Sequence, residues 1–401
     1  MSATLIERDR SRTAVTPAPG VRASRYEETF ARFTGASHAV AFGYARHALI
    51  GVLEAFGAGE GDEVILSPLT CKVVPLALLS MKLKPVYADI SAETLNLDPR
   101  SVESVIKPAT RAVLFQCTYG NLAGADGVSE ITARNRLPLI EDCAQCLPHA
   151  VDGYHPGRRG NAAIFSNNLL KPLPAGSGGL AVTNDGALAR KIQSFRDAMP
   201  PQGVFARLGL RAEKLAHDIL LRPEWYWPIF NLHRRFNSAH RARPVELEID
   251  DEIRRLAYRP SEYQMRVGLR SSARLEPLVA HRRHCCAEYA KALRERSSPD
   301  FDLIPVVKNE DAQPLYYFPI LARDKPGLLR AAQRRRVELI AWPLSAPIYP
   351  LERTDELRNY GYEPGACPVA EAIAERLVGL PTHSRMTEAE RRRVIELLVG
   401  D

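Results

Sequence analysis

The first half of the chain alternates between short apolar runs and longer segments in which apolar residues recur at helical spacing. Each apolar run ends at polar or turn-forming residues, which is typical of buried strands. The predicted strands are 63–67, 84–90, 111–116, 137–142 and 179–184, and helices are predicted at 25–33 and 45–56. Short apolar strands separated by helices indicate an α/β fold, with a mostly parallel central sheet and helices on both faces.

The pattern divides the chain into three parts. Residues 1–22 are polar and contain proline, so we expect a mobile N-terminal arm. Residues 23–260 carry the alternating pattern and form the predicted large domain. Residues 261–401 form a predicted smaller C-terminal α+β domain.

The predicted smaller domain rests on three signals. A long helical stretch, 258–293, leads into it. Strand-like runs at 315–320 and 337–342 flank a helix. The chain closes with a helix that begins after an N-cap threonine, Thr387, and runs to Leu398.

A segment of different character, 203–250, interrupts the large domain and is predicted to be a helical insertion. Val204, Leu208, Leu215 and Ile219 recur at helical spacing, and the aromatic run 225–230 follows among mostly basic residues. This pattern fits a peripheral membrane contact or a partner surface through 203–243. It also fits a helical insertion packed on its own protein, which is the interpretation we favour.

Charge and cysteine usage restrict the function classes. The net charge is +7, but lysine and arginine are scattered among acidic residues, so we expect a solvated surface and no nucleic-acid partner. Seven cysteines without a regular framework indicate reduced thiols and a cytoplasmic protein. Cys143 and Cys146 form a CxxC with no second pair at zinc-ligand spacing, so no metal site is expected. Neither a signal peptide nor an apolar run of ~18 residues is apparent.

Lys171 is the first candidate for chemistry. It lies five residues after Ser166 in a mostly uncharged segment, and a glycine cluster at 176–179 follows. A lysine with a desolvated amine suits a Schiff base, since its ammonium loses a proton more readily. The glycines let the backbone approach a flat cofactor. Taken alone, the segment also fits an ordinary loop lysine.

Asp142 and the loop 43–49 complete the candidate site. Asp142 ends a predicted buried strand and suits a pyridinium nitrogen, although an aspartate after a strand also fits a helix N-cap. Ser166 offers a hydroxyl to a phosphate, and the loop 43–49 opens a helix whose first amides suit the same group. An aspartate, a lysine and a phosphate-binding helix start together predict a pyridoxal 5′-phosphate (PLP) site.

These motifs resemble the DegT/DnrJ/EryC1/StrS sugar aminotransferase family of fold-type I PLP-dependent enzymes. The resemblance runs from about Arg25 to the C-terminus. Six segments carry the resemblance, and they are specific when their order and spacing are taken together. These segments are 57–65, 85–90, 140–145, 165–171, 176–179 and 380–383. The segment 203–250 matches the family least.

The resemblance implies a role for each matching residue. Lys171 takes the position of the Schiff-base lysine, and Asp142 that of the partner of the pyridine nitrogen. Gln145 lies over the ring near its hydroxyl. Ser166 corresponds to the phosphate-binding serine, and Ala45-Arg46 to the pair whose amides also hold phosphate. Such proteins are homodimers whose sites are completed by the partner chain, and they move an amino group from Glu or Gln to a keto group, most often of a nucleotide-linked keto sugar.

Two of the departures from the family pattern concern residues around the cofactor. Thr70 is followed by Cys71 where the family stacks an aromatic residue on the ring; a sulfur packs there with less area. The partner-chain asparagine that reaches the phosphate falls at Ala257, and Arg259 is our candidate replacement. These departures indicate retained cofactor binding and an unusual substrate pocket.

Two alternatives stay open. One is a PLP enzyme that acts on a cyclitol or another ketone, or that has altered chemistry. Lys171 argues against the dehydratases of the family, which carry histidine at that position. The other is a non-catalytic regulatory protein that keeps the fold.

Overall fold

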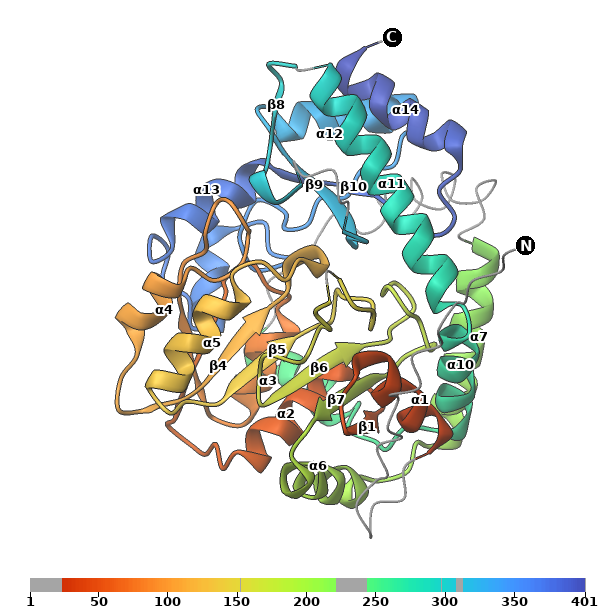
Figure 1. Ribbon diagram of the computed structural model, residues 1–401. Helices are drawn as coiled ribbons and strands as arrows, with labels where there is room; N and C mark the ends of the chain where they lie inside the picture. Colours follow the sequence, from red (N-terminus) through yellow and green to blue (C-terminus); the bar gives the residue numbers. More distant parts are fainter. Residues whose placement is uncertain (1–23, 152, 221–243, 297, 308–312, 401) are drawn as a thin grey trace, which may run out of the picture.

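The computed structural model (Figure 1) describes residues 24–151, 153–220, 244–296, 298–307 and 313–400. A seven-stranded sheet of order β1-β7-β6-β5-β4-β2-β3 forms its centre. Neighbouring strands are parallel from β3 to β6, whereas β7 is antiparallel to both β6 and β1. The strands are β1 (His38–Phe42), β2 (Glu63–Leu66), β3 (Lys84–Tyr87), β4 (Thr110–Gln116), β5 (Leu139–Asp142), β6 (Ala162–Ser166) and β7 (Gly179–Thr183).

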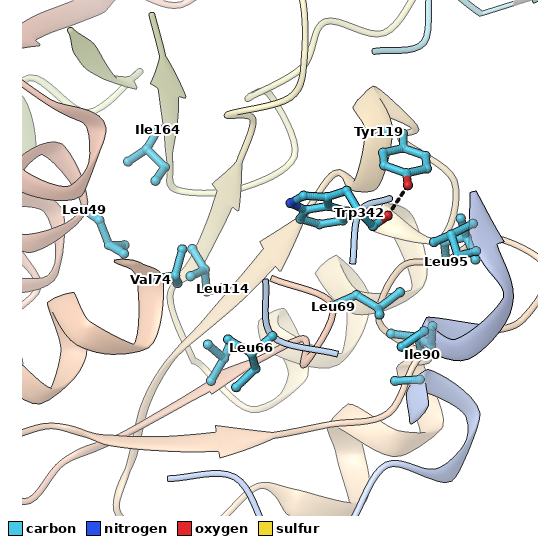
Figure 2. Packing of buried hydrophobic residues seen from close by; sticks show 14 of the residues in the cluster. Leu49, Leu66, Leu69, Val74, Ile90, Leu95, Leu114, Tyr119, Ile164 and Trp342 are labelled. Carbon is cyan, nitrogen blue, oxygen red and sulfur yellow. Dashed lines mark hydrogen bonds between the residues drawn. The ribbon is translucent and has the colours of Figure 1, made fainter. Parts of the chain in front are cut away.

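Helices cover both faces of this sheet because alternate side chains of each strand point to opposite faces. On β6, Ile164 joins a cluster with Leu49 of α2, whereas Phe165 joins a second cluster with Phe30 of α1. Figure 2 shows part of the first cluster, with Leu66 and Leu114 from neighbouring strands. Each such buried side chain contributes about 1.5–3 kcal/mol. The first face carries α2 (Ala45–Ala55), α3 (Val73–Ser80) and α6 (Gly186–Ala198), and the second carries α1 (Arg25–Thr34), α4 (Pro99–Val105) and α5 (Ala125–Arg134).

A three-stranded antiparallel sheet of order β10-β9-β8 forms the centre of the C-terminal part. The long helix α11 runs from the large sheet to this small sheet (Figure 1). Its first turns bury Val279 with the second cluster, and Tyr289 near its end packs on Phe318 with ring centroids 5.7 Å apart. The elements are β8 (Phe301–Leu303), β9 (Tyr317–Ala322), β10 (Leu377–Pro381), α11 (Leu275–Glu295), α12 (Lys325–Arg335), α13 (Pro368–Arg376) and α14 (Glu388–Val399).

Further helices connect these parts. They are η1 (Thr118–Gly120), α7 (Val204–Leu220), α9 (Val245–Ile249), η2 (Asp250–Arg254), α10 (Glu262–Ser272), η3 (Pro305–Val307) and η4 (Thr354–Tyr360). The start of α10 is fixed by a capping box between Ser261 and Gln264, and that of α14 by one between Thr387 and Glu390. In each box the hydroxyl and the longer side chain satisfy backbone amides that the helix itself leaves free.

The predicted fold class is confirmed: a mostly parallel sheet with helices on both faces and a small C-terminal sheet. Four strands were not predicted: β1 and β6 in the large sheet, and β8 and β10 in the small sheet. The predicted strand 337–342 is wrong, since only Ile340 forms a single bridge, with Gly379. The helical stretch 258–293 is broken at residues 273–274 into α10 and α11.

The domain boundaries, 1–22, 23–260 and 261–401, stay predictions. The arm 1–22 and the aromatic run 225–230 lie outside the described residues. Within the insertion, the helix predicted from Val204, Leu208 and Leu215 exists as α7, and these side chains are 58%, 53% and 63% exposed. The described residues therefore do not cover this face. Among the helices of the described ranges, none has the length and apolar character that crossing a membrane requires.

Candidate active site

The sheet register brings the candidate residues to one edge. Asp142 ends β5, and its Cα partner on the parallel strand β4 is Gln116. Ser166 ends the next strand, β6. In parallel sheets, ligands bind beyond the carboxyl ends of such strands. The side-chain amide of Gln116 donates to the carbonyl of Leu69 at 2.5 Å, which fixes the loop after β2 against this edge.

Asp142 is a buried carboxylate with an electrostatic link to Lys171. The residue is 3% exposed, and burial raises the pKa of its carboxyl group. The amide of Ala144, 2.9 Å from Oδ1, and the positive charge of Lys171 both act to lower this pKa. The charge of Lys171 therefore reaches the carboxyl group of Asp142 and favours its ionised form, against the effect of burial.

Lys171 lies in a loop between β6 and β7 that its own backbone closes. The backbone carbonyl of Asn167 accepts a hydrogen bond from the amide of Ala175 at 2.7 Å. The side-chain amide of Asn167 donates to the carbonyl of Leu173 at 2.6 Å. The Nζ of Lys171 lies 5.8 Å from the centre of the Tyr316 ring. The hydroxyl of Tyr316 donates to the carbonyl of Leu170 at 2.5 Å. Tyr316, from the segment leading into β9, thus forms one wall beside the amine and was not predicted.

A cradle for an anion lies at the start of α2. Ser166 pairs across the sheet with Gly179, whose backbone approaches α2 so closely that a Cβ would lie 2.3 Å from the nitrogen of Ala45. The N-cap residue Tyr44 makes no side-chain hydrogen bond to the first turn. The amides of this turn and the helix dipole therefore favour a negative group beside the Ser166 hydroxyl.

The side chain of Arg46 points away from this cradle. Its guanidinium forms an ion pair with Glu252 and donates to the Glu252 carbonyl at 2.7 Å. The backbone amide of Arg46 therefore stays available for a phosphate, as the resemblance implies. The charged side chain of Arg46 instead holds α2 against η2.

Gln264 and Tyr258 support the cradle and were missed from the sequence. The side-chain nitrogen of Gln264 lies 3.2 Å from the carbonyl of Gly43 and 2.6 Å from the hydroxyl of Ser177. The Tyr258 ring packs so tightly on Gly43 that a Cβ there would lie 2.7 Å from it. The capping-box spacing of Gln264 was visible in the sequence, but its contacts with two loops distant in the chain were not.

On the ring side, Gln145 is buried and oriented by Tyr119. Its side-chain oxygen accepts the backbone amide of Tyr119 at 2.6 Å. Tyr119 adopts a left-handed conformation, with φ of 57°, which is uncommon for a residue with a side chain. Its hydroxyl donates to the carbonyl of Trp342 in the C-terminal part, as Figure 2 shows. This tyrosine thus links the ring side of the site to the small sheet.

Cys71 and Arg259 each pair through the backbone with a segment distant in the chain. Cys71 is half-buried beside Tyr349, because the backbone of the loop after β2 pairs with that residue: Lys72 donates to the Tyr349 carbonyl at 2.8 Å. Arg259 has an exposed side chain, and its amide donates to Pro200 at 2.9 Å. The single chain does not bring Arg259 to Lys171, so its proposed reach into a neighbouring subunit stays a prediction.

The residues present fit PLP. A buried carboxylate faces the charge of a lysine, which suits a pyridinium nitrogen and an aldehyde on one ring. At the other end, Gly179, the strand partner of Ser166, lets the backbone of the start of α2 approach closely, since a Cβ at position 179 would lie 2.3 Å from Ala45. Lys171, Asp142, Gln145 and Ser166, with the amides of Ala45 and Arg46, are the residues that would hold the cofactor.

Comparison with known proteins agrees with the fold. An aminotransferase from Psychrobacter cryohalolentis has a similar structure, with a TM-score of 0.71 and 20% identity, over 93% of this chain and 89% of that chain. The architecture is therefore that of an aminotransferase. The chain belongs to the DegT/DnrJ/EryC1/StrS aminotransferase family, whose model matches residues 9–209 and 237–399.

Two curated relatives show the range of substrates in proteins similar to this one. L-glutamine:2-deoxy-scyllo-inosose aminotransferase of Streptomyces kanamyceticus is 36% identical over 45% of this chain, and the match spans 44% of that relative. GDP-perosamine synthase of Caulobacter vibrioides is 28% identical over 93% of this chain and 88% of its own length. The chain thus matches less than half the length of the first relative and most of the second.

Proposed function

We propose that this protein is a PLP-dependent aminotransferase. The observation that carries the proposal is the electrostatic link between buried Asp142 and Lys171. Asp142 ends β5, and Ser166 ends the neighbouring strand β6, whose partner Gly179 lies against the start of α2. Catalysis and cofactor binding both need this arrangement. Membership of the family supports the same reaction class.

Each residue has a defined task. When bound, PLP supplies an aldehyde and an electron sink. The amine of Lys171 would hold the cofactor through its aldehyde and would move a proton at Cα of the amino donor. Asp142 holds the proton on the pyridine nitrogen. Ser166 and the first amides of α2 bind the phosphate, and Tyr316 shields the amine from water on one side.

For the acceptor we propose a keto group on a nucleotide-linked sugar, with Glu or Gln as the amino donor. The near full-length match to GDP-perosamine synthase supports this acceptor class. A keto cyclitol is the second candidate, supported by the 36% identity to the 2-deoxy-scyllo-inosose aminotransferase.

The test is a panel of nucleotide-linked keto sugars and keto cyclitols, each with Glu or Gln, and mass spectrometry of the products. We expect a one-amino-group product from a nucleotide-linked sugar. Product from the cyclitol alone would transfer the assignment to the second candidate, and no product from any pair would contradict the proposed class.

We also propose that two copies share each site, with Arg259 reaching the phosphate of PLP or the substrate diphosphate in its neighbour. Its exposed side chain and the loss of an amide side chain at Ala257 support this assignment. A mixed dimer of Arg259→Ala and Lys171→Ala chains should then contain one site built from two intact halves. Activity above that of either parent is the expected result, and its absence would rule the shared site out.

A further inference from the structure

Three cysteine thiols meet beneath the ring side of the site. Cys117 directly follows β4, Cys143 directly follows β5, and Cys146 lies in the turn that Cys143 begins. All three sulfur atoms lie within 4.8 Å of one another, and those of Cys117 and Cys143 are 4.0 Å apart. The first two residues are fully buried and Cys146 is 6% exposed. The sequence had shown only the CxxC pair; the parallel register of β4 and β5 adds the third thiol.

The spacing fits a metal ion bound by three sulfurs. A metal–sulfur bond of about 2.3 Å in a trigonal arrangement places the sulfurs about 4.0 Å apart, the distance found between Cys117 and Cys143. Among the described residues, no histidine or carboxylate joins this group as a fourth ligand. Glu141, the nearest acidic neighbour in sequence besides Asp142, accepts the backbone amides of Gly157 and Arg159. We propose that Cys117, Cys143 and Cys146 form a binding site for a thiophilic metal ion that accepts three-coordinate geometry, of which Cu(I) is the test case.

Among the described residues, the other buried cysteines do not form such a group of three. Cys285 and Cys286 are adjacent on α11 and buried, and the sulfur of Cys285 lies 3.4 Å from Nε2 of His281. Three sulfurs from two strand ends and a turn instead face one point. Soft thiolate ligands select ions such as Cu(I), whereas Zn²⁺ prefers a fourth ligand.

Binding of the ion has to displace protons. Burial, together with the neighbouring thiols, raises the pKa of Cys143 well above its usual range. Burial also acts to raise the pKa of Cys146, but hydrogen bonds from the thiols of Cys117 and Cys143 lower it to about 6. Because the thiols must lose their protons to bind an ion, affinity should fall as the pH is lowered.

The site is joined to the active site through the backbone. The amide of Cys117 donates to the carbonyl of Asp142 at 3.0 Å, and Cys143 follows Asp142 directly. Gln145 precedes Cys146. An ion held by these thiols would fix both strand ends that carry the ring-side residues.

The test is titration of the reduced, full-length protein, loaded with PLP, with Cu(I) against a chromophoric chelator. We expect one ion per chain. Cys143→Ala should lower the affinity for Cu(I) by at least ~100-fold, because mutation of a group that merely supports a metal ligand already lowers metal affinity about 10- to 100-fold. Cys146→Ser provides a second variant at the least buried position. The matched control, Cys285→Ala with Cys286→Ala, should bind as the wild type does.

X-ray absorption of the loaded protein gives an independent answer, with three sulfurs at about 2.3 Å expected. Equal Cu(I) affinity in wild type, Cys143→Ala and Cys146→Ser would overturn the site. Two sulfurs only, or a tighter four-coordinate complex with Zn²⁺, would overturn the three-coordinate assignment. None of these readouts depends on transamination.

Discussion

The two ends of the candidate active site are built in different ways. The ring end uses residues within a few positions of two neighbouring strand ends, Asp142 and Gln145 among them, so the sheet itself positions them. The phosphate end gathers residues from three distant parts of the chain: Ser166 and Gly179 of the consecutive strands β6 and β7, Ala45 of α2, and Gln264 of α10. The ring end should therefore lose chemistry when it is altered, and the phosphate end should lose cofactor affinity.

The largest effect is expected from Lys171→Ala. Covalent attachment of PLP and transamination should both be lost, because no other amine lies at this position of the loop. The fold should persist, since the side chain is partly exposed. Absorbance of the bound cofactor and product formation measure the two losses. Lys84→Ala, at an exposed lysine on β3, is the control and should behave as the wild type does.

Gly179→Ala attacks the phosphate end. The new Cβ would lie 2.3 Å from backbone atoms of Ala45, which cannot move without shifting α2. We expect PLP to bind about 10- to 100-fold more weakly, or ~1.4–2.8 kcal/mol. Overpacking should also cost about 1–3 kcal/mol of unfolding free energy. Gly59→Ala adds a methyl group in open space and should change neither value. Unaltered PLP affinity in Gly179→Ala would show that the cradle is not the phosphate site.

Asp142→Asn tests the ring end while preserving its shape. An amide can still accept the Ala144 amide but cannot hold a proton on the pyridine nitrogen. PLP should remain bound, and proton transfer should slow by about 100-fold, the typical cost of removing one such electrostatic contact. Single-turnover conversion with the amino donor measures it. A wild-type rate would remove Asp142 from the proposed role.

The smallest effect is expected from Gln264→Ala. The carbonyl of Gly43 and the hydroxyl of Ser177 lose their buried donor, which should cost about 1–3 kcal/mol of stability and weaken PLP binding roughly 10-fold. Glu390→Ala is the control, because Glu390 occupies in the capping box of α14 the position that Gln264 occupies in that of α10. It should lower stability alone. Equal loss of PLP affinity in both variants would mean that Gln264 acts only through its helix.

The sequence predicted the ring end and much of the fold because their signals are local. Apolar runs predicted most strands, and the order and spacing of Asp142, Ser166 and Lys171 indicated a PLP site. The supports of the phosphate end, Gln264 and Tyr258, were missed because they meet Gly43 only in the folded chain. Cys117 was missed for a similar reason: only the register of β4 and β5 brings it to Cys143. Strand 337–342 failed because this run meets β10 at one residue only: Ile340 pairs with Gly379, and no ladder continues from that pair.

The central claim is that Lys171 and Asp142 catalyse amino transfer with bound PLP. The most direct measurement is the absorbance spectrum of the PLP-loaded wild type during addition of L-glutamine or L-glutamate, followed by a keto acceptor. The account predicts that the band of the bound cofactor disappears with the donor and returns with the acceptor, and that Lys171→Ala shows neither change. A wild-type spectrum that no amino donor alters would contradict the account and favour a protein that keeps the fold without the chemistry.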